Sequence, residues 1–279
     1  MDKSPMNYVG GKYRLLPQIL PLFPNRINTF VDLFCGGVDV ATNIQADHKI
    51  ANDINCYIID IYKYFQSVTI ADLLDRIESL ISEYDLSRTN EAGYKALRTH
   101  YNDNPSAIEL FVLICFAFNN QIRFNNSHQY NSTFGRNRSD FNDVLKGNLV
   151  KFHENIKGIE FVSMNYRDFN YAVLKPGDFL YADPPYLIST GTYNDGKRGF
   201  EGWSKDDDQY LFRILDDLND RGVNFALSNV FENKGLVNEP LIEWSEKYNV
   251  YNLDRSYNHC CFCRSEKTSK TVEVLITNY

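Results

Sequence analysis

Thr29-Phe-Val-Asp-Leu-Phe-Cys35, followed at once by Gly36-Gly37, is the most informative segment for the fold. A short apolar run that ends on two glycines is typical of a buried strand and a tight turn. Residues 38–46 then favour a helix, and Lys49-Ile-Ala-Asn-Asp-Ile54 favours a second strand. Because strand, helix and strand follow one another directly, this region predicts a βαβ unit with parallel strands.

The rest of the chain alternates in the same way but is interrupted by a mostly helical segment. A helix is expected to run through Phe65, and residues 70–118 keep a helical period. Pro105 should break that period, and Ser106 can cap the helix that follows. Further strands are expected at residues 159–163, 179–182, 224–228, 250–253 and 271–276, with a helix near 206–221. The predicted fold class is α/β with a helical insert.

Residues 119–138 predict a long polar loop or hairpin, in which Phe124, Tyr130 and Phe134 are interspersed. Loops of this length are usually functional or disordered, and the aromatic residues argue against disorder. The segment 121–157 carries six Lys or Arg against three Asp or Glu, in a chain of net charge -7. On charge alone, a solvated surface and a nucleic-acid contact fit this segment equally well.

The composition is that of an ordinary globular protein, with 43% hydrophobic and 23% charged residues among 279. No apolar run follows the N-terminal lysine, and the longest run, residues 110–118, is too short to cross a bilayer. We therefore expect a soluble cytosolic protein that does not associate with membranes. The cluster His259-Cys-Cys-Phe-Cys263 lacks a C-x2-C pair, so we expect a buried strand or turn there and no metal site.

Asp183-Pro-Pro-Tyr186, directly after the expected strand 179–182, is the strongest chemical signal. Ligands of α/β sheets bind beyond the carboxyl ends of the strands, so these residues should line a site. Asp183 and the Pro184 carbonyl can both accept hydrogen bonds from one amino group, which would orient a poorly nucleophilic nitrogen such as adenine N6 for attack on a methyl sulfonium. Tyr186 can stack on a flat base. The alternative is a proline-rich turn without chemistry.

The glycine turn and two aspartates suit a nucleoside ligand. Asp53 ends the second strand, 21 positions after Asp32, where an acid can accept hydrogen bonds from ribose hydroxyls. Because G-x-G-x-x-G is absent, the pattern does not support a dinucleotide. Near the N-terminus, Asn7-Tyr-Val-Gly-Gly-Lys-Tyr13 does not match a phosphate loop, and Lys12 can instead pair with the carboxylate of a methionine moiety.

In these motifs and in their order, the chain resembles the Dam-like, D12 class of DNA adenine-N6 methyltransferases. The resemblance is carried by residues 7–12, 30–37, 52–53, 119–136, 168–169, 183–186 and 273–276. It implies a Rossmann-like methyltransferase fold with a mostly helical target-recognition insert, and S-adenosylmethionine as methyl donor without a metal. The implied catalytic domain is discontinuous, residues 1–66 and 155–279, and residues 67–154 form the implied target-recognition domain.

The resemblance also implies roles for individual residues. Cofactor contacts are implied for Tyr8, Lys12, Asp32, Phe34, Asp53, Asp168, Phe169 and Asp183. Catalysis on the target base is implied for Asp183, Pro184 and Tyr186. DNA contacts are implied for Arg123, Asn125, Tyr130, Asn131, Thr133, Arg136 and Arg138. Arg123 matches the family arginine that bonds guanine O6 and N7 together in the major groove.

The expected partner is double-stranded DNA, whose target adenine must leave the base stack to reach the site. GATC is the leading expectation for the recognition site. Thr133 stands where GATC-specific members have proline, so another short site containing adenine stays open. The alternatives are cytosine-N4 DNA methylation, methylation of protein or RNA, and a non-catalytic DNA-binding specificity partner. We expect a monomer or weak dimer encoded by a bacterium or a phage, inside or outside a restriction-modification system.

Overall fold

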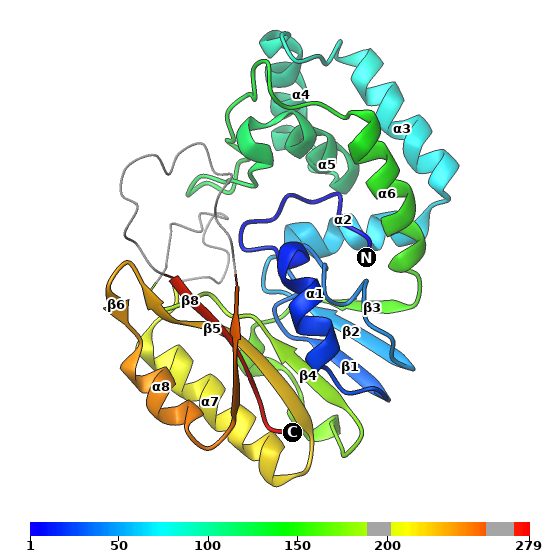
Figure 1. Ribbon diagram of the computed structural model, residues 1–279. Helices are drawn as coiled ribbons and strands as arrows, with labels where there is room; N and C mark the ends of the chain where they lie inside the picture. The colour runs from blue at the N-terminus through cyan, green and yellow to red at the C-terminus, as the bar shows by residue number, and fades with distance from the viewer. Residues whose placement is uncertain (189–201, 255–270) are drawn as a thin grey trace.

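The computed structural model describes residues 1–188, 202–254 and 271–279, and Figure 1 shows a sheet-based body with a helical lobe above it. The sheet has the spatial order β3-β2-β1-β4-β5-β8-β7, and β6 pairs with β5 at one end. The strands are β1 (Thr29–Asp32), β2 (His48–Asn52), β3 (Ile159–Val162), β4 (Phe179–Ala182), β5 (Asn224–Asn233), β6 (Leu236–Val237), β7 (Asn249–Leu253) and β8 (Thr271–Thr277).

The sheet is parallel on one side and antiparallel on the other. Strands β3, β2, β1, β4 and β5 run parallel, whereas β8 is antiparallel to both β5 and β7. From β1 the chain moves outward to β2 and β3 and then returns to β4 on the other side of β1. Ligand crevices form at such a switch point. The α/β fold class and the parallel pairing of the first two strands are confirmed.

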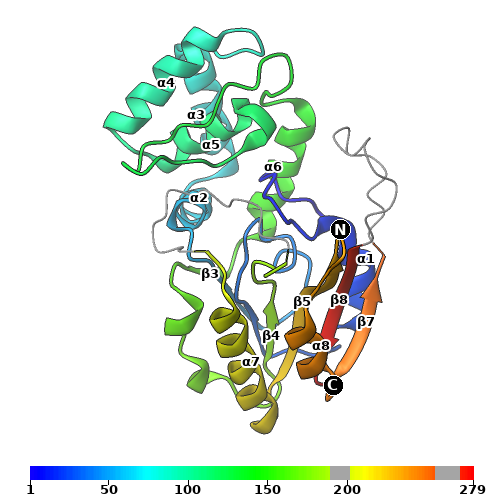
Figure 2. The same cartoon turned by 90° about the vertical axis from the view of Figure 1, so that its left-hand side faces the viewer.

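Helices cover both faces of the sheet, as the nearly continuous apolar strands require. Alternate residues of β1 point to opposite faces: Phe30 packs with α1 (Leu16–Ile19) and α2 (Cys56–Ser67), whereas Val31 packs with α7 (Lys205–Asp220) and α8 (Glu239–Ser245). Figure 2 shows α7 and α8 together on one side of the sheet. The result is a three-layer body in which the strand ends remain accessible.

The helical lobe consists of α3 (Ile70–Glu83), α4 (Glu91–Asp103), α5 (Ala107–Phe116) and α6 (Asp143–Asn155). Helix α5 is apolar on nearly all sides and packs against α2, α3 and α4, so it forms the centre of the lobe. The break expected at Pro105 is present, and Ser106 Oγ caps α5 by accepting a hydrogen bond from the Glu109 backbone N–H at 3.4 Å. The figure places this lobe directly above α2 (Figure 1).

The helix expected over residues 38–46 is wrong, because this segment forms a series of turns. Val38 has a φ of 62°, outside the right-handed helical region, so a helix cannot begin at the glycine turn. The Asp39 carboxylate accepts a hydrogen bond from the backbone of Ser4, 35 positions earlier in the chain. Tertiary contacts with the N-terminal segment therefore replace the regular hydrogen bonds of a helix here.

Other elements of the structure differ from the prediction made from the sequence. Helices α6 and α8 were not predicted, and β5 continues to Asn233, well past the expected end at residue 228. Residues 189–201 and 255–270 lie outside the described part, so the turn or strand expected at residues 259–263 is untested. Among the described residues, no helix is both long enough and apolar enough to cross a membrane.

Candidate active site

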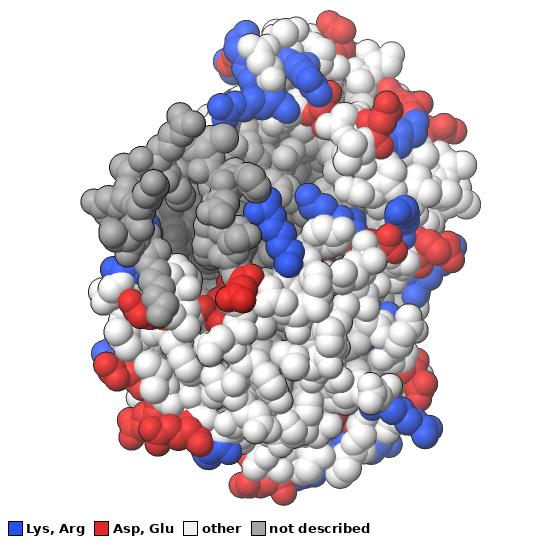
Figure 3. All heavy atoms as spheres, viewed as in Figure 1, with Lys and Arg blue, Asp and Glu red and all other residues white. Residues whose placement is uncertain are grey.

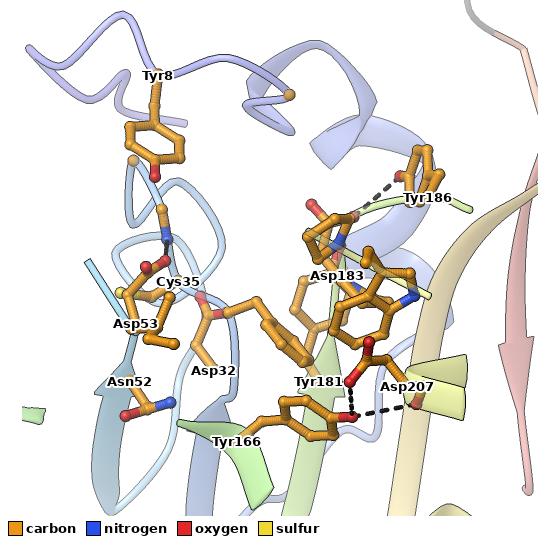
Figure 4. Close-up of a pocket in the computed structure, with 18 of the residues that line it drawn as sticks. Tyr8, Asp32, Cys35, Asn52, Asp53, Tyr166, Tyr181, Asp183, Tyr186 and Asp207 are labelled. Atoms are coloured by element: carbon orange, nitrogen blue, oxygen red, sulfur yellow. Dashed lines mark hydrogen bonds between the residues drawn. The ribbon is translucent and has the colours of Figure 1, made fainter. Parts of the chain in front are cut away.

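A cavity of about 520 Å³ opens at the carboxyl ends of β1, β2 and β4, at the switch point of the sheet. This volume lies within the usual range for sites that bind small molecules. The predicted residues that line it are Tyr8, Lys12, Asp32, Phe34, Asp53, Asp183, Pro184 and Tyr186. Figure 4 shows Asp32 and Asp53 on one side of the cavity and Asp183 and Tyr186 on the other.

The glycine turn after β1 brings the backbone close to an aromatic ring. Gly36 has a φ of +45°, and a Cβ atom at this position would lie 2.8 Å from Cδ1 of Tyr8. The Tyr62 hydroxyl of α2 donates a hydrogen bond to the Gly36 carbonyl at 2.7 Å. Both the backbone conformation and the ring contact therefore require glycine, and the turn positions Tyr8 at the cavity.

Asp53 is held by the backbone around it. One carboxylate oxygen accepts from the Gly36 N–H and the other from the Asn55 N–H, both at 2.9 Å. A carboxylate oxygen has two lone pairs, so a carboxylate that is held by backbone N–H groups can also accept a hydrogen bond from a ligand. Asn52 fixes the same region, because its side chain bonds to Leu33 of the β1 end and to Met164 after β3.

Asp32 is the cavity residue whose hydrogen bonding is incomplete. It is 1% exposed, and its Oδ1 atom has no hydrogen-bond partner among the described residues. Burial raises the pKa of Asp32 well above its ordinary value, and the nearby carboxylates of Asp183 and Asp53 add to this shift. A buried carboxyl oxygen without a partner among the described residues, in a cavity of this size, fits a hydrogen-bond donor such as the α-ammonium group of S-adenosylmethionine.

Asp183 lies at the centre of a charged network. Its Oδ2 atom is 2.6 Å from Lys12 Nζ, and its Oδ1 atom accepts a hydrogen bond from the Tyr186 hydroxyl at 2.9 Å. Burial and the carboxylates of Asp183 and Glu273 raise the pKa of Tyr186, so its hydroxyl stays protonated and donates. Lys12, expected to pair with a methionine carboxylate, is ion-paired with Asp183 in this structure because the N-terminal segment folds over the end of β4.

An aromatic wall closes another side of the cavity, and it differs in part from the prediction. Phe34 packs against Trp203 and Tyr166, with ring centroids 5.7 and 5.4 Å apart. Asp168 and Phe169, expected to frame the cofactor's adenine, do not belong to the cavity lining described here. The 3-10 turn of Tyr166–Asp168 leaves Asp168 exposed, whereas Tyr166 lines the cavity.

The loop of residues 117–139 is held together by its own backbone. Short antiparallel bridges join Phe124 to Tyr130 and Ala117 to Phe134. Tyr130, expected to contact DNA, is 1% exposed, and its hydroxyl bonds to the Gln121 carbonyl at 3.1 Å. That expectation is wrong, because the ring is an internal anchor of the loop and is not available to a duplex.

Three further predicted DNA residues form hydrogen bonds within this loop. Asn125 Oδ1 accepts hydrogen bonds from the Ser127 and Gln129 backbones, so it forms a turn within the loop. Asn131 is half-buried, and its backbone N–H donates to the Arg123 carbonyl at 2.9 Å. Thr133 is exposed, and its carbonyl accepts from the Phe118 N–H at 2.7 Å. Of these three, Thr133 presents its side chain most freely.

The three predicted arginines are all exposed but have different surroundings. Arg136 is ion-paired with Glu91 of α4 at 2.6 Å, and Arg138 lies 5.4 Å from the centre of the Phe118 ring. For the Arg123 side chain, no hydrogen bond or ion pair with another described residue is recorded. Figure 3 shows Lys and Arg side chains at the top of the view, over the helical lobe.

The loop and the cavity meet through one stacked pair of rings. Tyr57, at the start of α2, lies 3.8 Å from Phe124 between ring centroids, at an interplanar angle of 11°. Asp53 and Ile54, just before α2, line the cavity. A single short segment therefore contacts both the ligand cavity and the base of the loop.

Several residues at or next to the site were not among the predicted site residues. Asp39 and Trp203 line the cavity, and burial raises the pKa of Asp39. Glu273 is 1% exposed behind Lys12, with its Oε1 atom 3.8 Å from Lys12 Nζ. Buried charge inside a strand is a usable signal for Glu273, whereas Trp203 becomes part of the site through tertiary packing alone. No group of three or more His, Cys, Asp and Glu side chains within the described ranges is arranged to hold a metal.

Comparison with known proteins gives a consistent assignment. The chain is 49% identical to "Type II methyltransferase M.FokI" of Planomicrobium okeanokoites and 47% identical to "Modification methylase StsI" of Streptococcus sanguinis, each over 99% of this chain and 43% of the relative. It is 31% identical to "Modification methylase LlaI" of Lactococcus lactis subsp. lactis over 100% of this chain and 44% of that protein. The chain thus spans less than half the length of these relatives.

The family match covers the cavity and the loop of residues 117–139 together. Residues 8–259 match the family described as D12 class N6 adenine-specific DNA methyltransferase. This range includes the glycine turn, both strand-end aspartates and the Asp183-Pro-Pro-Tyr186 motif. The resemblance seen in the motifs is therefore confirmed, and the chain belongs to the D12 class N6 adenine-specific DNA methyltransferase family.

Proposed function

We propose that this chain transfers a methyl group from S-adenosylmethionine to N6 of an adenine in double-stranded DNA. The observation that carries the proposal is the placement of Asp183 at the end of β4, inside the cavity and facing the half that Asp32 and Asp53 line. When bound, S-adenosylmethionine supplies an electrophilic methyl group on a sulfonium. The chain's own residues orient the amino group and exclude water.

In this proposal Asp183 accepts a hydrogen bond from the target amino group. The Pro184 carbonyl supplies a second acceptor, and the two together favour the positive charge that develops on the nitrogen. Tyr186 stacks on the extruded base, which offsets part of the cost of unstacking it. Pro184 is buried in the cavity wall, and Tyr186 lies beside it.

For the cofactor half, Asp32 is proposed to pair with the α-ammonium group and Asp53 with the ribose hydroxyls. Tyr8 and Phe34 line the same half of the cavity and provide apolar contact. Asp53 is suited to its role because its two backbone hydrogen bonds hold the carboxylate in place before any ligand binds. No metal ion takes part in the proposed transfer.

We propose that residues 67–154 act as the target-recognition domain and residues 1–66 and 155–279 as the catalytic domain. Helix α2 ends at Ser67 and α6 ends at Asn155, so both boundaries coincide with helix ends. The loop of residues 117–139 is then the reading element, with Arg123 bonding a guanine. Arg136 and Arg138 are proposed to contact phosphates.

GATC is the first recognition sequence to test, and other short sites containing adenine remain in competition because Thr133 can offer both a methyl and a hydroxyl group to base edges. The relatives named as modification methylases come from bacteria, so we propose a role in a bacterial restriction-modification system, in the cytoplasm. The protein is expected to act as a monomer or weak dimer.

The test is methyl transfer by purified protein from tritiated S-adenosylmethionine to plasmid DNA. Chromatography of the digested nucleosides should show label in N6-methyladenine and none in N4-methylcytosine. Modification-sensitive sequencing of the same plasmid then reports the recognition site. Label in cytosine, or no transfer by protein that binds S-adenosylmethionine, would contradict the proposal.

A further inference from the structure

Glu273 is a buried acid directly behind Asp183. It lies in β8, is 1% exposed and does not belong to the described lining of the cavity. Its Oε1 atom is 3.4 Å from the Tyr186 hydroxyl and 3.8 Å from Lys12 Nζ. It also lies outside the residues 8–259 that match the family. A buried carboxylate at this position needs a physical explanation.

The fold directs Glu273 toward the site. Side chains alternate along β8: Val274 and Ile276 pack with α7 and α8, whereas Leu275 packs on the opposite face. Glu273 shares the face of Leu275, at a position where the pattern calls for an apolar residue. The pairing of β5 with β8 shifts directly beside it, between Val230 and Glu232. Such bulges occur next to active sites, where they re-aim a side chain.

Among the described residues, Lys12 is a cation that both Asp183 and Glu273 approach, and it is 4% exposed. Taking a carboxylate out of water is costly even when it is paired, and an apolar residue at this position would avoid that cost. The contacts of Glu273 with the neighbouring site residues therefore offer a better explanation of the glutamate than stability does.

Asp183 has partners on both oxygens before a target base arrives. Lys12 Nζ lies 2.6 Å from Oδ2, and the Tyr186 hydroxyl lies 2.9 Å from Oδ1. The positive charge of an ammonium group this close offsets part of the negative charge that Asp183 needs for stabilising the target nitrogen. Tyr186 must also turn its ring toward the base. In the described part of the chain, Glu273 is a second carboxylate that both donors already approach.

We propose that Glu273 is a positioning residue for methyl transfer, which receives Lys12 Nζ and the Tyr186 hydroxyl as Asp183 turns to the target amino group. This inference rests on the proposed function. No bond of Glu273 is made or broken in the reaction. The residue keeps Lys12 charged and in place, and it leaves Asp183 free to accept from the nitrogen that is being methylated.

The test compares Glu273→Gln with Glu109→Gln in otherwise unchanged protein. Glu109 is a matched control because it is also a buried glutamate, 5% exposed and paired with His100 at 3.1 Å in the helical lobe. Four quantities are measured: the single-turnover rate of methyl transfer, the Kd for S-adenosylmethionine, the Kd for duplex DNA, and the fluorescence of 2-aminopurine at the target position, which reports base extrusion.

Glu273→Gln is expected to lower the single-turnover rate by on the order of 10- to 100-fold, the range typical of residues that orient a catalytic ligand from behind. Both Kd values and the 2-aminopurine signal should stay within about twofold, because Glu273 touches neither ligand. Glu109→Gln should leave the rate within the same factor. In a Tyr186→Phe background, the effect of Glu273→Gln should shrink, since one of its two partners has been removed.

An unchanged rate in folded Glu273→Gln protein would overturn the inference. So would a parallel loss of rate and of S-adenosylmethionine binding, because that pattern marks general damage to the site. If the glutamine variant does not fold, Glu273→Asp decides: a slower rate with unchanged Kd values supports the inference, and an unchanged rate refutes it. Wild-type protein that methylates no DNA would instead refute the proposed function, and the role of Glu273 with it.

Discussion

The cavity at the sheet edge and the loop of residues 117–139 are both rich in polar side chains, but those side chains are hydrogen-bonded in different ways. In the cavity, acidic side chains lie at strand ends: the backbone binds Asp53, and Asp32 keeps one oxygen atom without a partner among the described residues. In the loop, polar side chains bond to the loop itself, and the aromatic ring of Tyr130 is buried inside it.

Reacting groups and base-reading groups need different kinds of support from the fold. A reacting group must keep a defined position and a defined charge, and a strand end surrounded by other backbone segments provides both. A reading group must reach a base edge, so it has to be exposed on a support that does not move. Arg123 is exposed on a hydrogen-bonded loop, which suits a reading group. Asp183 lies at a strand end and is ion-paired, which suits a reacting group.

The largest effect should come from the cavity. Asp183→Ala should reduce the rate of methyl transfer on the order of 10²-fold or more, because it removes an acceptor needed mainly in the transition state. The Kd for S-adenosylmethionine should change far less, since Asp32 and Asp53 carry that contact. Single-turnover kinetics and calorimetry measure the two quantities. Near-normal turnover would show that the strand end does not determine the chemistry.

The next effect belongs to the loop. Arg123→Ala should relax discrimination at one G·C pair by about 1–3 kcal/mol, because a bidentate base contact is lost. Arg136→Ala serves as the comparison, and it should weaken binding to all sequences alike and reduce the salt dependence. Competition between duplexes altered one pair at a time separates the two. If Arg123→Ala weakened every duplex equally, the arginine would be a phosphate contact.

A third prediction tests how the loop is held. Gly135→Ala should destabilise the protein by about 1–3 kcal/mol, because a Cβ atom there would lie 2.4 Å from Ser139 Oγ and 2.8 Å from the Ala117 carbonyl oxygen. Gly147→Ala is the matched control: its Cβ would meet nothing within 4 Å, and it lies inside α6. That variant should be more stable by about 0.5–1 kcal/mol. Urea unfolding measures the stability of both variants. Equal unfolding midpoints would contradict a tightly packed loop.

The smallest expected effect is the release of a proton when S-adenosylmethionine binds. Because burial and neighbouring carboxylates raise the pKa of Asp32, its neutral form is favoured in the folded protein, and stability falls as pH rises from the unfolded value of about 3.9 through the raised value. An ammonium group bound beside Asp32 favours the carboxylate instead. Binding of S-adenosylmethionine should therefore release a fraction of a proton and tighten as pH rises through that raised pKa.

Calorimetry in buffers of different ionisation enthalpy measures this release. Asp32→Asn should abolish the dependence on buffer, because the amide has no proton to lose. A dependence that persists in Asp32→Asn protein would assign the proton to another group. In that case the partner-free oxygen of Asp32 would have a different role in the cavity.

Sequence reasoning succeeded where a residue's role depends on its neighbours along the chain. The strands, the glycine turn, the Ser106 cap and the cavity position of Asp183 all follow from local pattern and from the rule for strand ends. It was wrong for residues 38–46 and for Tyr130, since both segments are shaped by contacts with distant parts of the chain. It expected Asp168 and Phe169 at the cavity, whereas the described lining contains the neighbouring Tyr166.

The fold class, the family and the acids that line the cavity can be predicted from the sequence, because strand periodicity and a motif at a strand end are local properties of the chain. Tertiary structure alone decided which side chains meet. Lys12 joins Asp183 across 171 positions of the chain, and Glu273 reaches both from the far end through β8. Packing brings such groups together because burying the apolar faces of the sheet determines which strand ends become neighbours, and no pattern within a single segment contains that information.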